Sequence, residues 1–378
     1  MAMFGKPVTS CHRTEVAADE PAAIPLVIRR LESTVKVFWD PVQLLHTPRF
    51  FLVRGQQRPN LEVPARAESL LVACSALGLP IEMPSPSGLA PVSAVHDPAY
   101  LGFLRDGHAA WRQLADAGEE MVANAHPAPE VLAHRREPPS HIIGQLGWFT
   151  ADAACPIGAD TWRAAEAAAS CAVAAADEAA AGRHAYALAR PPGHHTYRAR
   201  AGGHCYLNNA AIAAERLRAR GVGRVAVLDI DSHHGNGTQG IFWDRPDVLF
   251  VSVHGDPNHY YPWFAGHADE RGGGLGQDCN LNLPLTLGTG DPGWLAAIET
   301  GLAAIAAFRA DALVVSLGFD ASEYEPLNAL SVTEDGFARA GRAIGQAGLP
   351  TAIVQEGGYN VGLLGTLLRR FMGGFGGS

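Results

Sequence analysis

The sequence predicts one large α/β domain with a central, mostly parallel sheet and helices on both of its faces. Strand-like and helix-like segments alternate along most of the 378 residues, as in folds built from parallel strands. The strand-like segments are short apolar runs, which is typical of parallel strands buried on both faces. Hydrophobic residues make up 47% of the chain and charged residues 18%, a composition that supports a large core.

The first strand candidate is 35–39, a run of valines and aromatic residues. The 34 residues ahead of it show weak periodicity, so we expect 1–34 to be an N-terminal extension and 35–378 to be the domain. Periodicity and composition predict helices over 65–77, 97–114, 161–181, 208–220, 292–308 and 332–347. Apolar runs predict further strands over 184–189, 224–230, 248–254, 312–317 and 351–355. Four prolines indicate a long loop over 126–140.

Composition argues against several classes of partner. The net charge is −9, and no run of Lys or Arg marks a surface for nucleic acid or an anionic membrane. No apolar stretch reaches membrane-spanning length, and the N-terminus lacks the pattern of a secretory signal. The six cysteines lie far apart without C-x-x-C spacing, so neither a cysteine zinc site nor a disulfide scaffold is indicated. We expect a soluble, cytoplasmic protein that binds no nucleic acid and no membrane.

The most informative stretch is 225–238, an apolar strand that runs into two Asp, two His and an Asn. Asp231 and His233 form an Asp-x-His pair, and carboxylate oxygen and neutral imidazole nitrogen are both good ligands for Zn²⁺. The alternative is a turn whose polar residues are satisfied by hydrogen bonds.

Polar residues also follow four other predicted strands directly, namely those at 184–189, 248–254, 312–317 and 351–355. In open α/β sheets, ligands bind beyond the carboxyl ends of the strands. We therefore expect segments scattered from His184 to Asn360 to meet in one cleft.

These motifs together resemble the deacetylase branch of the arginase–deacetylase superfamily. The matching segments are RPPGHH (190–195), GGHCYLNNAAIAA (202–214), LDIDSHHGNGT (228–238), VSVHGDP (251–257), LGFDASEYEP (317–326) and EGGYN (356–360), with VHDPAYL (95–101) ahead of them. They are most similar to bacterial acetylpolyamine amidohydrolases and class II histone deacetylase-like amidohydrolases. The resemblance implies a single arginase-like α/β domain with one catalytic divalent metal at the carboxyl edge of the sheet.

The resemblance places Asp231, His233 and Asp320 on the metal, expected to be Zn²⁺, with Fe²⁺, Co²⁺ or Mn²⁺ as alternatives. It makes His195 the general base and acid and His194 its electrostatic support. By analogy Asp229 orients His194, and Asn236 orients His195.

The resemblance also makes Tyr359 the hydrogen-bond donor to the developing oxyanion, on a turn that Gly357 and Gly358 permit. Asp229 and Ser252 resemble part of a monovalent-cation site, expected to hold K⁺; alternatively, Asp229 is only a buried supporting carboxylate.

The predicted substrate tunnel departs from the family pattern. Its residues are Gly203, His204, Tyr261 and Ile143. His204 stands where the family usually has an aromatic ring, and Ile143 stands where acetylpolyamine enzymes carry an acid. Three arginines of the early loop, Arg49, Arg54 and Arg58, would repel a cationic substrate.

We expect a metal-dependent amidohydrolase that removes acetyl or short acyl groups from acylated primary amines, such as acetylpolyamines. One alternative is a deacetylase of acetyl-lysine in proteins or peptides, and another is a catalytically silent binding or sensor protein. An arginase-type activity is disfavoured, because Asn236 follows His234-Gly235 where a second metal would need a carboxylate. The segment 126–140 resembles an insertion that supports homodimers in the polyamine subgroup; alternatively, it is a mobile surface loop.

Overall fold

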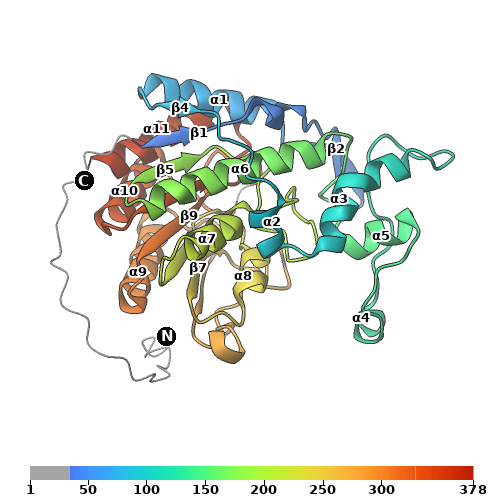
Figure 1. Cartoon of the computed structure of the whole chain (residues 1–378). Coiled ribbons are helices and arrows are strands. Elements are labelled where there is room, and N and C mark those ends of the chain that lie inside the picture. Colours follow the sequence, from blue (N-terminus) through green and yellow to red (C-terminus); the bar gives the residue numbers. More distant parts are fainter. Residues whose placement is uncertain (1–34, 328, 378) are drawn as a thin grey trace.

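The computed structural model describes residues 35–327 and 329–377, so the predicted extension 1–34 lies outside the described residues (Figure 1). Its main sheet has eight parallel strands in the order β4-β1-β5-β10-β9-β6-β7-β8. Their bounds are β1 Lys36–Phe38, β4 Ile81–Glu82, β5 His184–Ala187, β6 Val225–Asp229, β7 Val248–Gly255, β8 Asn280–Leu285, β9 Ala312–Leu317 and β10 Thr351–Gln355. The predicted fold class is therefore confirmed.

Helices cover both faces of this sheet. One face packs against α2 (Leu89–Val95), α3 (Pro98–Trp111), α5 (Ile142–Phe149), α6 (Thr161–Ala180), α7 (Asn209–Ala219) and α8 (Asn236–Phe242). The other face packs against α1 (Pro64–Ala76), α9 (Asp291–Phe308), α10 (Glu334–Gln346) and α11 (Val361–Gly376). Successive residues of β6 alternate between the two cores, with Val225 and Val227 in one and Ala226 and Leu228 in the other. Figure 1 shows α6 and α7 over the near face of the sheet.

The structure corrects two parts of the sequence-based assignment. A short helix, α4 (Pro129–His134), lies within the predicted loop 126–140; Pro129 is at its first turn, where a missing N–H costs nothing. Elements that the sequence did not predict are the 3₁₀ turns at Pro41–Leu45 and Gly274–Gly276, the hairpin of β2 (Phe50–Val53) and β3 (Gln56–Pro59), and β4, β8, α2, α5, α8 and α11.

Helix α11 is the longest of these missed elements, and its glycines explain the omission. Glycine lowers helix propensity, so the segment does not read as a helix from local preference alone. In the fold, a Cβ at Gly374 would lie 1.9 Å from the carbonyl oxygen of Ala338 on α10. Gly374 thus permits the close packing of α11 against α10, which stabilises a helix that its sequence alone does not.

The five strands followed by polar residues are consecutive in the sheet, in the order β5-β10-β9-β6-β7. Because all five are parallel, their carboxyl ends lie along one edge. The expectation that these segments meet is confirmed. No helix in the described part of the chain is both long and apolar enough to cross a membrane.

His96, just before α3, fastens this helix to the segment that carries the polar residues after β5. Its Nε2 accepts the backbone N–H of Asn208 at 2.9 Å, and its Nδ1 lies 3.3 Å from the carbonyl oxygen of Arg198. The side chain is fully buried. Burial lowers the pKa of His96 from 6.5 to about 4, so the neutral ring is the folded form at neutral pH.

We expect His96 to weaken the fold as the pH falls. Because its folded pKa lies below its unfolded pKa, its contribution is complete above pH 6.5 and is lost between pH 6.5 and about 4. The loss is about 3 kcal/mol at about 1.4 kcal/mol per unit of pKa. Denaturant unfolding at several pH values should show a shallower decline for His96→Asn, and an unchanged decline for the exposed control His134→Gln. An equally steep decline in His96→Asn would contradict this assignment.

Candidate active site

Three side chains that could hold a metal ion meet at the carboxyl ends of neighbouring strands β6 and β9. Asp231 and His233 follow β6, and Asp320 follows β9. His233 Nδ1 lies 2.9 Å from Asp320 Oδ2 and 3.1 Å from Asp231 Oδ1. One ligand atom from each residue lies within 4.8 Å of the others, and all three residues are buried. The structure therefore brings together the three residues predicted as ligands.

Backbone groups fix both carboxylates in place. Asp231 Oδ2 accepts the N–H of Gly357 at 2.9 Å, and Asp320 Oδ1 accepts the N–H of Ser232 at 2.8 Å. A Cβ at Gly357 would lie 2.3 Å from Asp320 and 2.5 Å from Asp231, so only glycine allows the backbone to come this close. Each carboxylate keeps its other oxygen directed at His233.

The site favours a positive charge. Burial alone would lower the pKa of His233, but the carboxylates of Asp320 and Asp231 raise it to about 9. Two carboxylates and one imidazole leave coordination positions for water and a substrate oxygen, as catalytic rather than structural sites do. The donor set thus fits a divalent cation.

His194 stands beside this group as a charged residue. Its Nδ1 lies 2.9 Å from Asp229 Oδ2, and its Nε2 lies 3.9 Å from Asp231 Oδ1. Burial opposes charge on the ring, but Asp229 and Asp231 raise the pKa of His194 to about 10. The predicted pairing of Asp229 with His194 is present in the structure.

His195, by contrast, is neutral. Asn236 donates through Nδ2 to the Tyr197 hydroxyl at 2.9 Å, so its Oδ1 faces His195 and accepts from Nδ1 at 2.7 Å. This arrangement places the His195 proton on Nδ1 and leaves Nε2 as an acceptor. Burial, followed by the charges of His194 and His233, lowers the pKa of His195 well below 6.5. A neutral ring with a free acceptor nitrogen can receive a proton.

Tyr359 lies on the turn after β10, with its ring buried against Arg66 of α1. The Arg66 guanidinium lies 4.7 Å from the centre of the Tyr359 ring. It also donates to the carbonyl oxygens of Gly358 at 2.5 Å and Glu356 at 2.6 Å. Burial raises the pKa of Tyr359 well above 10, so the hydroxyl keeps its proton.

Glu62 holds the Arg66 side chain in place through an ion pair. Its carboxylate lies 2.8 Å from Arg66 and 2.9 Å from Arg190, and all three side chains are buried. Burial raises the pKa of a carboxyl group, but the two guanidiniums hold the pKa of Glu62 below its usual value. The ion pairs therefore remain charged inside the protein.

The sequence analysis did not assign a role to Glu356, Arg66 or Glu62. Glu356 Oε2 accepts the N–H groups of Gly193 at 2.7 Å and His194 at 3.1 Å, and so fixes the start of the tandem histidines. Glu356 opens the EGGYN motif, so the motif itself was a usable signal. Arg66 and Glu62 lie in a segment without a motif, about 290 residues before the turn that Arg66 binds.

The predicted tunnel residues Gly203 and Tyr261 lie beside His195. A Cβ at Gly203 would lie 2.4 Å from His195 Cδ2 and 2.9 Å from the Tyr261 hydroxyl. The Tyr261 ring packs edge-on against His195 at a centroid distance of 4.9 Å. Its hydroxyl donates to Asp152 Oδ2 at 2.6 Å, and Asp152 also accepts the N–H of Gly203. Asp152 is thus an acid in contact with two of the predicted tunnel residues, and no sequence motif pointed to it.

His204, another of the predicted tunnel residues, has its ring centre 5.8 Å from that of Tyr359 and 5.3 Å from that of Phe51. Burial lowers the pKa of His204 to about 4, so the ring is neutral. Ile143, by contrast, lies at the first turn of α5 and is 48% exposed, outside this buried cluster.

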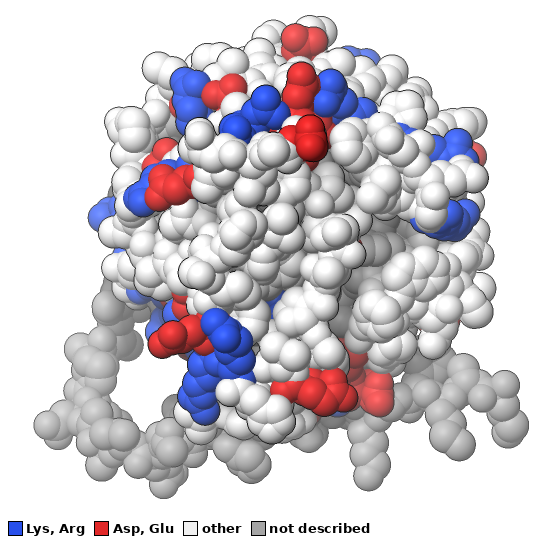
Figure 2. Space-filling model, turned by 90° about the vertical axis from the view of Figure 1, so that its right-hand side faces the viewer, with Lys and Arg blue, Asp and Glu red and all other residues white. Residues whose placement is uncertain are grey.

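The charges of the early loop are less uniform than its sequence indicates. Arg49 pairs with Glu119 at 2.8 Å and Glu120 at 3.2 Å. Arg54 and Arg58 are exposed at the hairpin of β2 and β3. Figure 2 shows the side on which α3 and α5 lie, where charged groups of both signs gather toward the margins and the middle carries few. The expected repulsion of cations therefore does not extend to Arg49, whose charge is balanced.

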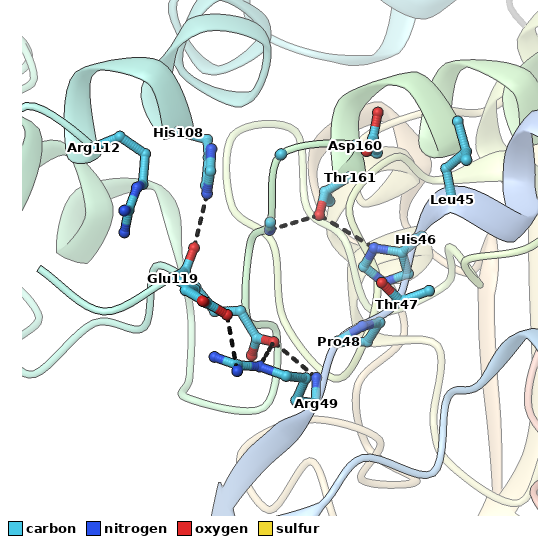
Figure 3. A pocket seen from close by; sticks show the side chains of 13 residues that line it. Leu45, His46, Thr47, Pro48, Arg49, His108, Arg112, Glu119, Asp160 and Thr161 are labelled. Atoms are coloured by element: carbon cyan, nitrogen blue, oxygen red, sulfur yellow. Dashed lines mark hydrogen bonds and ion pairs between the residues drawn. The ribbon is translucent and has the colours of Figure 1, made fainter.

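A pocket of about 470 Å³ opens between the segment 45–49, α3 and the start of α6 (Figure 3). Its wall contains Arg49, which pairs with both Glu119 and Glu120, also in the wall. His46, also in the wall, lies 3.7 Å from Glu62. The pocket thus adjoins the back of the buried ion pairs, and the reacting groups lie elsewhere.

The two residues expected at a potassium site face each other across neighbouring strands. Asp229 of β6 is in register with Ser252 of β7, and both are fully buried. Asp229 already receives bonds from His194 and from the N–H of Asp231, so it also serves as a supporting carboxylate.

Comparisons with known proteins agree with this geometry. Acetylpolyamine amidohydrolase from Burkholderia pseudomallei (strain 1710b) is 47% identical over 341 residues, which are 90% of this chain and 98% of that protein. Acetylpolyamine amidohydrolase from Mycoplana ramosa is 39% identical over 88% of this chain and 96% of its own length. A crystal structure of acetylpolyamine aminohydrolase from B. pseudomallei has a TM-score of 0.86 and 46% identity, covering 90% of this chain and 98% of that one.

Residues 60–374 match the family described as the histone deacetylase domain. This match covers most of the chain and includes every residue of the candidate site that lies at the sheet edge. The resemblance predicted from the motifs is confirmed, and the chain belongs to the histone deacetylase domain family.

Proposed function

We propose that this protein is a metal-dependent amidohydrolase that removes acetyl or short acyl groups from small acylated primary amines of the acetylpolyamine type. The observation that carries the proposal is the convergence of three groups at one sheet edge. These are the metal-ligand trio of Asp231, His233 and Asp320, the tandem histidines His194 and His195, and Tyr359. The names of the similar proteins support the acetylpolyamine class of substrate.

Asp231, His233 and Asp320 would hold the metal, for which Zn²⁺ is the first choice and Fe²⁺ or Co²⁺ are alternatives. When bound, the ion polarises the amide carbonyl and makes water a stronger nucleophile. Backbone N–H groups hold the two carboxylates, so the ligands are oriented before the ion arrives.

His195 acts first as a base and then as an acid. Its Nε2 takes a proton from the attacking water, and the same nitrogen later gives a proton to the leaving amine. Asn236 keeps the ring in the tautomer that this requires. Burial, together with the charges of His194 and His233, lowers the pKa of His195 and keeps the ring neutral until the proton arrives.

Tyr359 donates its hydroxyl proton to a hydrogen bond with the substrate carbonyl oxygen. Negative charge grows on this oxygen as water attacks, so the bond is stronger in the transition state than in the ground state. The raised pKa of Tyr359 keeps it protonated for this role.

Asp152 supports a cationic substrate. Ile143 stands at the position where an acid was expected. The Asp152 side chain, however, contacts Tyr261 and Gly203, two of the predicted tunnel residues. A carboxylate there would attract the distal ammonium of a short diamine. A protein or peptide acetyl-lysine deacetylase remains the alternative, because its chemistry would use the same groups. A silent binding protein would have no need for the complete set of reacting groups.

Four further expectations rest on the sequence and complete the proposal. Asp229 and Ser252 would contribute to a K⁺ site, α4 and its flanking loop would support a homodimer, and the protein would act in the cytoplasm. Residues 1–34 would form an extension to the domain 35–378.

Hydrolysis of a matched panel tests the proposed function. The panel contains acetylputrescine, acetylspermidine, acetylcadaverine, an acetyl-lysine peptide and N-butylacetamide. We expect acetylated diamines to be hydrolysed with the highest kcat/KM. Tyr359→Phe should lower kcat by roughly 10²–10³-fold, because it removes one donor to the oxyanion. Faster hydrolysis of the peptide would favour the alternative substrate class, and no hydrolysis of any member would refute both.

Asp152→Asn tests the source of cation preference. Removing the charge should raise KM for acetylputrescine up to about fivefold, the value of a partly exposed ion pair of about 1 kcal/mol. KM for the neutral N-butylacetamide should stay the same. The exposed Asp269→Asn serves as a matched control. Equal changes in KM for both substrates would mean that Asp152 shapes the tunnel without selecting charge.

Metal binding can be measured without activity. Wild-type protein, stripped with a chelator, should bind about one equivalent of Zn²⁺ in calorimetry. Asp320→Asn should weaken binding by more than about tenfold, since even supporting residues of metal sites contribute that much. The exposed Asp269→Asn should bind normally. Unchanged zinc affinity in Asp320→Asn would remove Asp320 from the ligand set.

A further inference from the structure

Glu325 is a buried acid that the proposed reaction has not yet used. It lies five residues after Asp320 and is only 4% exposed. Its Oε1 accepts the backbone N–H of Tyr359 at 2.7 Å, and its Oε2 accepts the backbone N–H of Asn360 at 3.2 Å. One carboxylate therefore holds two successive peptide groups of the turn that carries the Tyr359 ring.

The turn is held on its other side by Arg66. Arg66 donates to the carbonyl oxygens of Gly358 and Glu356, and its guanidinium lies against the Tyr359 ring. The N–H groups at and after Tyr359 thus meet the two oxygens of the Glu325 carboxyl group, while the carbonyl groups before it meet the Arg66 cation. Opposed contacts of this kind fix the position of the peptide and not only its distance from one neighbour.

Glu325 also joins two segments that carry reacting groups. Phe319, just before Asp320, donates its N–H to the Gly357 carbonyl at 3.1 Å, and the bond of Ser322 N–H to the Phe319 carbonyl at 3.2 Å folds the chain between Asp320 and Glu325 into a turn. Asp320 is a candidate metal ligand, and Tyr359 is the proposed oxyanion donor. The Glu325 side chain therefore bridges the segment of one to the segment of the other.

A buried carboxyl group is costly at this place. Burial and the nearby Asp320 raise the pKa of Glu325 to about 8, so the surroundings disfavour its charge. The two N–H groups recover part of this cost, since hydrogen bonds to a carboxylate are stronger than those to a neutral acceptor. The structural role of the buried Glu325 side chain is therefore to accept these two N–H groups.

We propose that Glu325 is a positioning residue: by accepting the N–H groups of Tyr359 and Asn360, it sets where the Tyr359 hydroxyl lies relative to the metal-ligand group. This inference rests on the proposed function. Misplacing a reacting group by about 1 Å can cost about 10²-fold in rate, so a positioning residue can matter as much as a contacting one.

A double-mutant cycle between Glu325 and Tyr359 tests this inference with acetylputrescine as substrate. Glu325→Ala should lower kcat by about 10–10²-fold and change KM by less than about twofold, because the Tyr359 bond acts in the transition state. Glu325→Gln keeps one acceptor oxygen and should recover part of the loss. In the Tyr359→Phe background, Glu325→Ala should cost less than about twofold more, since residues that act through one group are not additive.

Two controls separate positioning from general damage. Glu323→Ala changes an exposed glutamate of the same segment and should keep the wild-type kcat. Zinc binding by calorimetry should be the same in Glu325→Gln, Glu325→Ala and wild type. If Glu325→Ala does not fold, Glu325→Gln carries the cycle.

The inference is overturned if the Glu325 variants keep wild-type kcat, if they lose zinc, or if they cost the same factor with and without the Tyr359 hydroxyl. The failure of the proposed function looks different. In that case Tyr359→Phe itself would leave kcat unchanged, or the wild-type protein would not hydrolyse the acylated amines, and both ideas would fall together.

Discussion

The structure depends on two buried carboxylates, Asp231 and Asp320, that face one imidazole, His233, at the carboxyl edge of the sheet. Two negative charges without solvent are unfavourable unless a positive charge accompanies them. The two carboxylates raise the pKa of His233, so that its ring can supply a positive charge, and a divalent cation would balance the two negative charges more fully. The carboxylates of Asp229 and Asp231 also raise the pKa of His194, whereas burial, together with the charges of His194 and His233, lowers the pKa of His195. The difference in charge between the tandem histidines therefore follows from burial and from the acids beside His194.

Hydrogen bonds to backbone groups connect the metal-ligand residues to other parts of the fold. Gly357 N–H binds Asp231, so the turn that carries Tyr359 is pulled against the metal-ligand group. Arg66 fixes the same turn from α1, and Glu62 joins Arg66 to Arg190, the first residue of the RPPGHH segment. A single buried carboxylate thus relates the positions of Tyr359 and the tandem histidines. The same contacts stabilise the fold and position the reacting groups, so a substitution at one of them should affect both stability and activity.

Much of this was accessible from the sequence, and the exceptions have physical reasons. The buried strands carry strong local signals, so the parallel sheet was predicted correctly, and the family resemblance of the motifs correctly grouped Asp231, His233 and Asp320. Arg66 and Asp152 were missed because their functions arise from contacts with Gly358 and Tyr261, far away in sequence. Helix α11 was missed because packing against α10, and not helix propensity, stabilises it.

The polar side chains on and near the predicted tunnel residues differ in how much charge they contribute. His204 replaces an aromatic ring, yet its burial lowers its pKa to about 4, so it adds polarity without charge near neutral pH. Arg49 is paired with glutamates and adds little net charge. Asp152 differs from both, because it is partly exposed and its oxygens accept hydrogen bonds from the Ala154 N–H and the Tyr261 hydroxyl. In the proposed function Asp152 would act on the substrate at short range, whereas the exposed arginines of the hairpin would act only at long, salt-screened range.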